Sequence, residues 1–443
     1  ATGLARAAIP SCRHRNTGVV VSAVELFEAA ACVPDRAKRR GAGTAAIVDL
    51  VGFREENVLP VAAFYDSQCG VSVNVLAELA SHRNHRARSR CCGMLSRLLV
   101  YLPDSYDHQT RLLPYVLSFL CDDVPSIRAA ALECIARCGR QYEEEHRDDV
   151  IERLQFGVDG DEAIDYDAGL PEPFASRPSL GARLFVRSNT GRFFLAVLGE
   201  LSSWRADTRR RSVDLTTVLA VYCEEHLTKD FQQTARSVVR GILVELSDSP
   251  SSTYLDGGES EILIGIRRFL KLMAKYVQPS AYLSVLIPRI ARNNPLHATS
   301  YSEDGSHSEQ ERAIHALVLT AMIEGTALER LLPSWLDLLT LVASEDCIGS
   351  FAGTNLRSQS TRVVMALLDK VKGEGIDALL SHCDQKPGER ERLQTIVSTS
   401  LSALTIEDEV DSIEAHQREE ASMRLSTLLQ GQSRLKMIVL TPN

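Results

Sequence analysis

The sequence predicts an all-α fold, an α-solenoid in which antiparallel helix pairs stack into a superhelix. Apolar residues recur at helical spacing through most of the 443 residues, and aromatic residues make up only 6% of the chain. Similar units return at an interval of about forty residues. A chain of this length would ordinarily divide into two or three globular domains, whereas a repeat array buries its core between neighbouring units and escapes that limit.

The clearest unit spans Leu112–Tyr142. Its first helix opens on a Leu-Leu-Pro sequence, and an Asp-Asp-Val-Pro turn follows, where the proline suits the first turn of a second helix. That second helix is amphipathic, and Ile127 and Arg128 stand near its start. We expect Gly139 to end it, because glycine is the usual residue just past a helix.

This layout resembles the HEAT repeat, whose second helix has a Val-Arg pair near its start. Arg88 lies forty residues before Arg128, and Arg209 lies eighty-one residues after it, each near the start of an expected helix. We expect Arg267 and Arg362 to stand at the openings of further helices of the same kind. The sequence therefore favours an armadillo-like solenoid of HEAT-type helix pairs.

The HEAT resemblance also implies a structural ladder, because the arginine at this place usually pairs with an aspartate in the turn of the next repeat. Arg128 is accordingly expected to bond to carboxylates or turn carbonyls between repeats. The ladder residues predicted on this basis are Arg88, Asp123, Arg128 and Arg209.

Composition shifts indicate how the array is organised along the chain. We expect residues 1–60 to be poorly defined and partly disordered; the arginines without acidic residues at the very start resemble a transit peptide weakly, and a fragment or flexible terminus is the alternative. The solenoid is expected over 61–405, and a charged helical tail that caps the stack over 406–443. Loops are expected within the solenoid at 155–180, 247–260 and 294–308.

Charge and cysteine usage exclude several classes of partner. The formal net charge is −9, which argues against nucleic acid as the main partner because phosphate binding needs a cationic surface. No stretch approaches the roughly 20 uncharged residues that span a bilayer, so no membrane partner is expected. The 11 cysteines are irregularly spaced in apolar helical windows, which is typical of a reduced, intracellular protein.

The sequence predicts no catalytic residue, cofactor or metal site, and a protein that is not an enzyme. No nucleophile elbow, phosphate-binding loop or zinc-protease helix occurs. The adjacent cysteines of the cluster His82, His85, Cys91 and Cys92 would point about 100° apart on a helix, so core packing is favoured over a metal. The acidic loop that begins at Asp159 lacks the calcium-loop pattern, since the twelfth place is Leu170.

The segment from 111 to about 228 is more specific than a generic repeat. A HEAT-type pair leads into an acidic insertion, the sequence Arg-Pro-Ser-Leu-Gly-Ala-Arg at 177–183, then Trp204 and the helix of Thr208-Arg209. This resembles the family of HEAT-repeat axonemal dynein assembly factors, in which an Arg-Pro-x-Leu-Gly-x-Arg segment follows an acidic insertion. The family's proteins are longer than this chain, and residues 1–60 do not match their pattern.

The resemblance implies a cytoplasmic scaffold that preassembles axonemal dynein arms before they enter cilia. Its implied partners are dynein heavy and intermediate chains, chaperones and other assembly factors. The alternative is a generic HEAT-repeat adaptor for another complex, such as a transport or phosphatase assembly.

Trp204, Arg210 and Arg211 are the candidates for partner binding, because interfaces are often anchored by tryptophan and arginine. Two interpretations of Trp204 stay open: it packs the core between helices, or it lies partly exposed beside the arginines and anchors an acidic partner. The segment Arg177–Asn189 mixes turn residues with apolar ones, and we predict that it packs back on the solenoid and leads into a helix.

Overall fold

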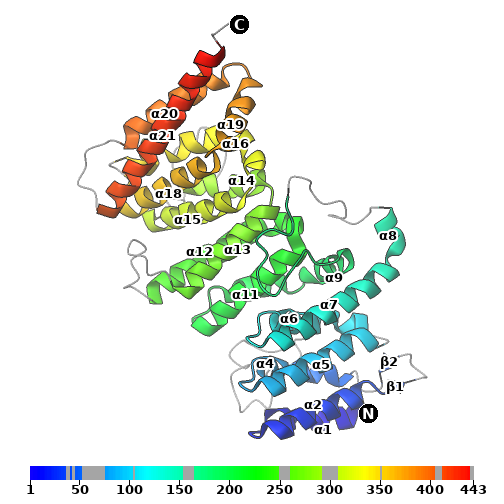
Figure 1. The fold of residues 1–443 in the computed structure, drawn as a ribbon. Helices are drawn as coiled ribbons and strands as arrows, with labels where there is room; N and C mark the ends of the chain where they lie inside the picture. Colours follow the sequence, from blue (N-terminus) through cyan, green and yellow to red (C-terminus); the bar gives the residue numbers. More distant parts are fainter. Residues whose placement is uncertain are drawn as a thin grey trace. The chain divides into compact units, whose positions relative to one another are not determined.

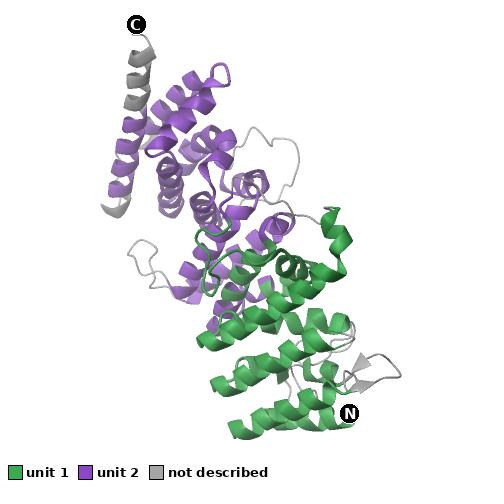
Figure 2. Ribbon diagram, turned by 45° about the vertical axis from the view of Figure 1, so that its right-hand side comes forward, with its two compact units in different colours: residues 1–159, 166–197, 214–223 green, residues 160–165, 198–213, 224–443 purple. Residues whose placement is uncertain are grey.

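The computed structural model describes residues 1–35, 40–41, 45–51, 75–102, 105–152, 164–248, 260–291, 308–349, 352–404 and 412–439. The chain forms two compact units (Figure 2). Unit 1 comprises residues 1–159, 166–197 and 214–223, and unit 2 comprises residues 160–165, 198–213 and 224–443. Helices α10 (Phe194–Glu200) and α11 (Ala206–Cys223) contribute residues to both.

The described part of unit 1 is mostly helical, and it also contains two strands of two residues each that pair antiparallel, Pro34 with Gly41 and Asp35 with Arg40. Its elements are α1 (Thr2–Ala8), η1 (Ile9–Arg13), α2 (Thr17–Ala31), β1 (Pro34–Asp35), β2 (Arg40–Gly41), α3 (Ala45–Val51), α4 (Val75–Ala80), α5 (His85–Tyr101), η4 (Ser105–His108), α6 (Gln109–Phe119), α7 (Pro125–Glu145), α8 (Arg147–Ile151) and α9 (Leu180–Thr190).

The helices of unit 1 stack in two layers (Figure 1). Helices α2, α5, α7 and α9 follow one another in one layer, each packed on the next, and α1, α4 and α6 pair with them from the other. Each helix buries an apolar stripe between its neighbours; in α5 this stripe includes Leu95 and Leu98, which are fully buried. A continuous core therefore runs along the stack, as a repeat array requires.

The N-terminal segment differs from the expectation for residues 1–60. Helix α2 packs on α5 and buries Val20, Val24 and Phe27 completely. Its acidic residue Glu28 is also buried, and the carboxylate is held by Arg90 at 2.6 Å and Arg97 at 3.0 Å. The other glutamate of the helix, Glu25, pairs with Arg90 at 3.5 Å, so both glutamates of α2 are paired with arginines of α5. The remainder of this expectation, at 36–39, 42–44 and 52–60, lies outside the described residues.

Gly139 lies inside helix α7, so the prediction that it ends the helix is wrong. Helix α7 continues to Glu145 and crosses α9 at this glycine. A Cβ atom on Gly139 would stand 2.3 Å from the backbone nitrogen of Ala182, and a Cβ on Gly181 would stand 2.2 Å from the carbonyl oxygen of Gly139. The glycine is needed because the two backbones touch, which a helix-ending signal alone does not distinguish.

The segment Arg177–Asn189 packs against the helices of unit 1, as the sequence predicts. Ser179 caps α9, and the helix buries Leu184, Phe185 and Val186 against its neighbours. Phe174, in the coil before α9, is buried edge-on against Tyr222 at a centroid distance of 5.5 Å. The described part of the expected loop at 155–180 is therefore a coil of mostly exposed or half-buried residues that Phe174 anchors to the helices.

Unit 2 continues the helical pattern. Its elements, after the shared helices, are η5 (Glu224–Asp230), α12 (Phe231–Asp248), α13 (Glu261–Tyr276), α14 (Pro279–Ile290), α15 (Glu309–Gly325), α16 (Leu328–Val342), α17 (Glu345–Ile348), α18 (Thr354–Lys370), α19 (Glu374–Asp384), α20 (Glu389–Leu404) and α21 (Ser412–Val439).

In unit 2, α13, α15, α18 and α21 pack in succession as one layer, while α14 and α16 pair with α15 and α18 (Figure 1). Trp335 of α16 is completely buried, and its indole nitrogen donates to the carbonyl of Leu367 at 3.1 Å. Helix α21 closes the succession with Leu425 and Leu428 buried, whereas Met423 is exposed. The predicted all-α solenoid class is confirmed, and no helix of the described residues is long and apolar enough to cross a bilayer.

Candidate functional site

A buried or half-buried arginine recurs at one helical position through both units. It is the fourth residue of six helices, α5, α7, α9, α11, α15 and α18, and these residues are Arg88, Arg128, Arg183, Arg209, Arg312 and Arg357. At the start of a helix an arginine side chain reaches back toward the preceding turn. We call these six residues the arginine ladder.

Arg88 shows the bonding pattern of the ladder. Its Nη1 donates to the carbonyl oxygen of His82, in the turn that precedes its own helix, at 2.9 Å. Its Nε and Nη2 donate to the two carboxylate oxygens of Asp122, in the turn of the following helix pair, at 2.7 and 3.0 Å. One guanidinium therefore joins two consecutive turns with a bidentate, charge-assisted contact.

Asp122, rather than the predicted Asp123, is the principal carboxylate of this contact. The side chain of Asp122 is 5% exposed, whereas Asp123 also touches Arg88 but is 83% exposed. Oδ1 of Asp122 accepts from the backbone N–H of Val124 at 2.9 Å, and this turn geometry points the side chain inward. The aspartate two residues before the helix cap was thus the signal that sequence reasoning missed.

Arg128 lies nearer the surface than Arg88 and makes weaker contacts. Its Nη1 donates to the carbonyl oxygens of Asp122 and Asp123, at 2.7 and 3.3 Å, both in the turn before its own helix. Among the described residues, its carboxylate contact is with Glu172 at 3.4 Å, and that glutamate is 88% exposed. Glu172 belongs to the coil before α9, so this carboxylate does not come from a turn between two helix pairs.

The side chain of Arg209 is 2% exposed, which is the lowest value among the ladder arginines for which the structure describes an ion pair with a carboxylate. It donates to Glu245 from Nε and Nη2 at 3.1 and 2.8 Å, and to Asp248 from Nη2 at 2.7 Å. Its Nη1 donates to the carbonyl oxygen of Ser203 at 2.8 Å, six residues earlier, as Arg88 does to His82.

Beyond Arg209, the positions expected from the sequence for the arginines at helix starts are wrong. Helix α13 begins at Glu261 and helix α18 at Thr354, so Arg267 and Arg362 lie well inside their helices and do not open them. The ladder residue of α15 is Arg312, which donates to the carbonyl oxygen of Ile290 at 2.8 Å and to the carboxylate of Asp346 at 3.0 Å. No Val-Arg-like pair marks Arg312 in the sequence, and it is recognised only because it is the fourth residue of its helix.

The Arg88–Asp122 contact predicts a loss of stability in acid. Burial raises the pKa of Asp122, but the hydrogen bonds from Arg88 and Val124 outweigh it, so the pKa lies below its ordinary value. A carboxyl whose pKa is lowered on folding stabilises the fold above its unfolded pKa of about 3.9, and this stability is lost as the pH falls through the folded value.

We expect Asp122→Asn to lower the free energy of unfolding of unit 1 by about 2 kcal/mol at pH 7, and to flatten its decline below pH ~4. Urea unfolding at pH 7, 5 and 3, followed by circular dichroism, measures both effects. Asp123→Asn is the matched control, since that carboxylate is mostly in solvent. Equal acid dependence in the wild type and Asp122→Asn would contradict the prediction.

The partner-binding candidates lie at the start of α11, in unit 2. Trp204 is 85% exposed, so the interpretation that it packs in the core is wrong. It stands in the turn before α11, where the helix has not yet begun and the side chain projects outward. The guanidinium of Arg205 lies 5.9 Å from its ring centroid, within reach of a cation–π interaction.

The neighbouring arginines add positive charge to this turn. Arg210 and Arg211 are exposed, while Arg209 between them and the turn is buried in the ladder. Arg210 makes a surface ion pair with Glu261 at 3.3 Å, in which both side chains are mostly in solvent. An exposed indole beside arginines fits an acidic, partly apolar protein surface. We call Trp204, Arg205, Arg210 and Arg211 the α11 patch.

The described residues hold no group of three or more metal-ligating side chains. Cys91 and Cys92 are buried in the core, and burial raises the pKa of both thiols, which disfavours the reactive thiolate. Of the acidic loop, Asp159 and Asp161 lie outside the described residues.

Two family models match the chain. The model described as Dynein axonemal assembly factor 5, HEAT-repeat domain, matches residues 170–380. The model described as Dynein axonemal assembly factor 5-like, TPR repeats, matches residues 68–153. TPR and HEAT units are both antiparallel helix pairs, so both descriptions agree with the helix pairs that the structure has there.

Curated relatives lead to the same family. Dynein axonemal assembly factor 5 of Xenopus laevis is 25% identical over 253 residues, which cover 57% of this chain and 26% of the relative. The protein of the same name from Homo sapiens is 24% identical over 207 residues, covering 47% of this chain and 22% of the relative. The chain thus spans about a quarter of the length of these relatives.

Among solved structures, a Kap121p mutant aligns over 100% of this chain and 44% of its own, with 13% identity and a TM-score of 0.37. Kap121p itself aligns over 96% and 46%, with 14% identity and a TM-score of 0.26. These scores are too low to support a functional comparison. On the two family models and the curated relatives, the chain belongs to the family of HEAT-repeat axonemal dynein assembly factors.

Proposed function

We propose that this chain is a non-catalytic HEAT-repeat scaffold that acts in the cytoplasm as an assembly factor for axonemal dynein arms. The observation that carries the proposal is the match of two models of one family to separate segments, 68–153 and 170–380. Its partners would be dynein heavy and intermediate chains, chaperones and other assembly factors. A rigid stack of helix pairs suits this role, because it spreads binding over a large surface without needing a reactive site.

The α11 patch supports a binding role in the structure itself. Trp204 is far more exposed than a tryptophan normally is in a folded protein, and the exposed arginines Arg205, Arg210 and Arg211 follow it in the sequence. Tryptophan and arginine are the residues most enriched at the energetic centres of interfaces. We propose that the α11 patch docks an acidic surface of one of these partners.

Affinity capture tests the proposed function. The tagged chain is expressed in cells that build motile cilia, and the cytoplasmic extract is probed for dynein heavy and intermediate chains and for chaperones. Enrichment of dynein chains over a tagged control scaffold is the expected result. Enrichment of a phosphatase or transport complex instead, with no dynein chain, would overturn the proposal in favour of a generic adaptor.

Trp204→Ala should weaken capture of the dynein or chaperone partner at least about tenfold while leaving the melting temperature nearly unchanged. The reason is that the indole is in solvent in the free chain and loses little packing when it is removed. Tyr106→Ala is the matched control, since Tyr106 is an aromatic residue that is 78% exposed in unit 1. Quantitative capture beside a thermal melt gives both readouts.

Two further observations decide whether the α11 patch is the docking site. The Arg210→Glu, Arg211→Glu double variant should bind as weakly as Trp204→Ala, and wild-type capture should weaken at high salt because the attraction is electrostatic. Undiminished capture by the folded double variant would rule the α11 patch out while leaving the assembly role to be carried by another surface.

A further inference from the structure

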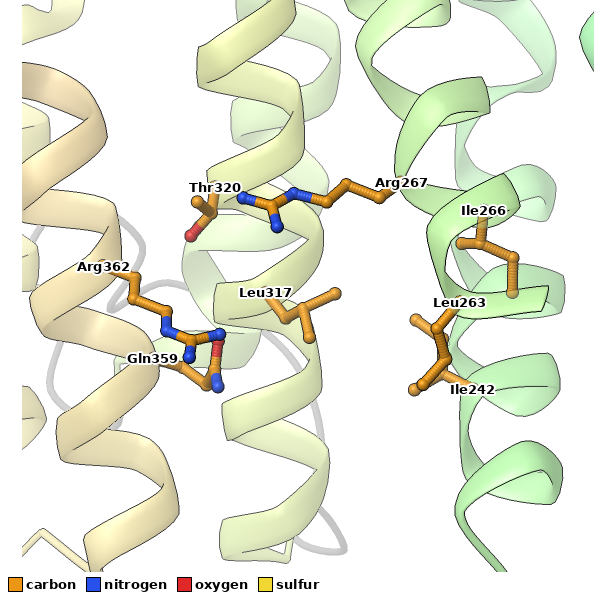
Figure 3. A pocket seen from close by; sticks show the side chains of 8 residues that line it. All are labelled: Ile242, Leu263, Ile266, Arg267, Leu317, Thr320, Gln359 and Arg362. Carbon is orange, nitrogen blue, oxygen red and sulfur yellow. The ribbon is translucent and has the colours of Figure 1, made fainter. Parts of the chain in front are cut away.

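A hollow opens on unit 2 between helices α12, α13, α15 and α18 (Figure 3). The space between its lining residues has a volume of about 420 Å³, and part of this volume is open to solvent. Its apolar wall is formed by Ile242, Leu263, Ile266 and Leu317, and its polar residues are Arg267, Thr320, Gln359 and Arg362.

Two arginines reach toward the middle of this hollow from opposite sides (Figure 3). Arg267 extends from α13 toward Thr320, and Arg362 extends from α18 to lie beside Gln359, so that Leu317 of α15 stands between the two. Leu317 is half-buried, and Gln359 is a buried polar side chain. The hollow therefore presents an aliphatic side chain flanked by two guanidinium groups.

Helix α13, which borders the hollow, is rich in cationic residues, and one of them, Arg267, lines the hollow. Helix α13 contains four cationic residues and one carboxylate, Glu261, which pairs with Arg210. The cationic residues are Arg267, Arg268, Lys271 and Lys275. Glu324 of α15 accepts from Arg267 at 2.8 Å and from Lys271 at 2.8 Å, so one carboxylate is shared by two cations. Of the described residues at the hollow, Arg267, Lys271 and Arg362 are cationic and Glu324 is anionic.

We propose that this hollow binds an acidic segment of a protein partner that carries one aliphatic residue between carboxylates. The aliphatic side chain packs on Leu317, and the carboxylates bind Arg267 and Arg362. A guanidinium has five N–H donors in a planar fork, so Arg267 can bind a second carboxylate while it holds Glu324. The proposal concerns a surface separate from the α11 patch and stands independently of it.

A protein segment fits the hollow better than a nucleic acid. The lining includes aliphatic residues and no aromatic ring on which a base could stack. The formal net charge of the chain, −9, also repels a polyanion whose charge is continuous along its backbone. A short acidic segment is recognised instead by a few carboxylates matched to local arginines.

The probe is a fluorescein-labelled peptide of sequence Gly-Ser-Asp-Glu-Leu-Glu-Asp-Ser-Gly, and binding to the full chain is followed by fluorescence anisotropy. We expect a Kd on the order of 100 μM at moderate salt, as befits one small contact. Replacement of the central leucine by serine, or of the four acidic residues by their amides, should each weaken binding about tenfold or more.

Charge-matched variants identify the site. Arg362→Glu should weaken binding about tenfold or more. Arg268→Glu, the same change on an exposed residue of α13 that does not line the hollow, should weaken it no more than about threefold. Arg362→Gln, which keeps a polar side chain, replaces Arg362→Glu if thermal melts show that the reversal disturbs folding, and should still weaken binding measurably.

Several results would overturn the proposal. They are the absence of binding at millimolar peptide, equal losses for Arg268→Glu and Arg362→Glu, or equal binding of the peptide with serine in place of leucine. Tighter binding of a ten-residue oligouridine with the same dependence on Arg362 would also overturn it, in favour of a nucleic acid. None of these measurements involves a dynein subunit, so their outcome is distinguishable from that of the proposed function.

Discussion

Replacement of Arg209 by alanine should lower the free energy of unfolding of unit 2 by about 3–5 kcal/mol. The guanidinium is almost completely buried and neutralises Glu245, whose side chain is 7% exposed. Removing the arginine leaves that carboxylate buried without its partner and leaves the Ser203 carbonyl without its 2.8 Å hydrogen bond. Urea unfolding and hydrogen exchange of helices α11 and α12 measure the loss.

Two comparisons separate the effect of losing a positive charge from the effect of leaving a buried carboxylate without its partner. Arg210→Ala removes the same charge from an exposed position, and we expect it to change stability by less than about 0.5 kcal/mol. Arg209→Met combined with Glu245→Leu should recover most of the loss, because an apolar pair avoids an uncompensated buried charge. A loss below about 1 kcal/mol for Arg209→Ala would show that the ion pair does not hold these turns together.

Gly139→Val should destabilise unit 1 by more than about 4 kcal/mol or prevent it from folding. Any Cβ at this position would stand 2.3 Å from the Ala182 nitrogen, so helices α7 and α9 would have to move apart along their whole contact. Backbone atoms cannot turn away as the end of a flexible side chain can. Thermal melts followed by circular dichroism, with limited proteolysis of the α7–α9 region, measure the effect.

Gly93, in the interior of helix α5, is the matched control. A Cβ there would meet only the Nη1 atom of Arg90, at 3.4 Å. Gly93→Ala should therefore stabilise the chain by about 0.5–1 kcal/mol, the usual gain when alanine replaces glycine in a helix. A well-folded Gly139→Val would mean that the close approach of α7 and α9 is not required.

The helical fold could be predicted from the sequence because its signal is repeated. Each helix shows its apolar stripe locally, and Arg88, Arg128 and Arg209 occur near the starts of expected helices. The prediction of helix starts failed in α13 and α18, where the sequence indicated starts later than the real ones. A two-residue motif such as Ile266-Arg267 occurs inside a helix as well as near its start. A ladder arginine is recognised only when the first residue of its helix is known, because it is the fourth residue from that start.

The parts of the site that sequence reasoning missed depend on side-chain direction. Asp122 and Asp123 are identical and adjacent, and only the turn hydrogen bond to Val124 decides which carboxylate faces Arg88. Whether Trp204 lies in the core or in solvent depends on where α11 begins, at Ala206. The hollow is formed by four helices whose lining residues span 120 positions, from Ile242 to Arg362, so no local pattern could have indicated it.

The bonding of the arginine ladder has a consequence for how neighbouring helix pairs align. Two helices that meet through smooth apolar stripes can slide along each other at little cost, since aliphatic contacts are non-directional. An arginine that holds the carbonyl of its own turn and a carboxylate of the next turn permits only one axial position. In each unit these contacts therefore act as a positional key: they set the offset between successive pairs, as a buried polar residue sets the register of a coiled coil.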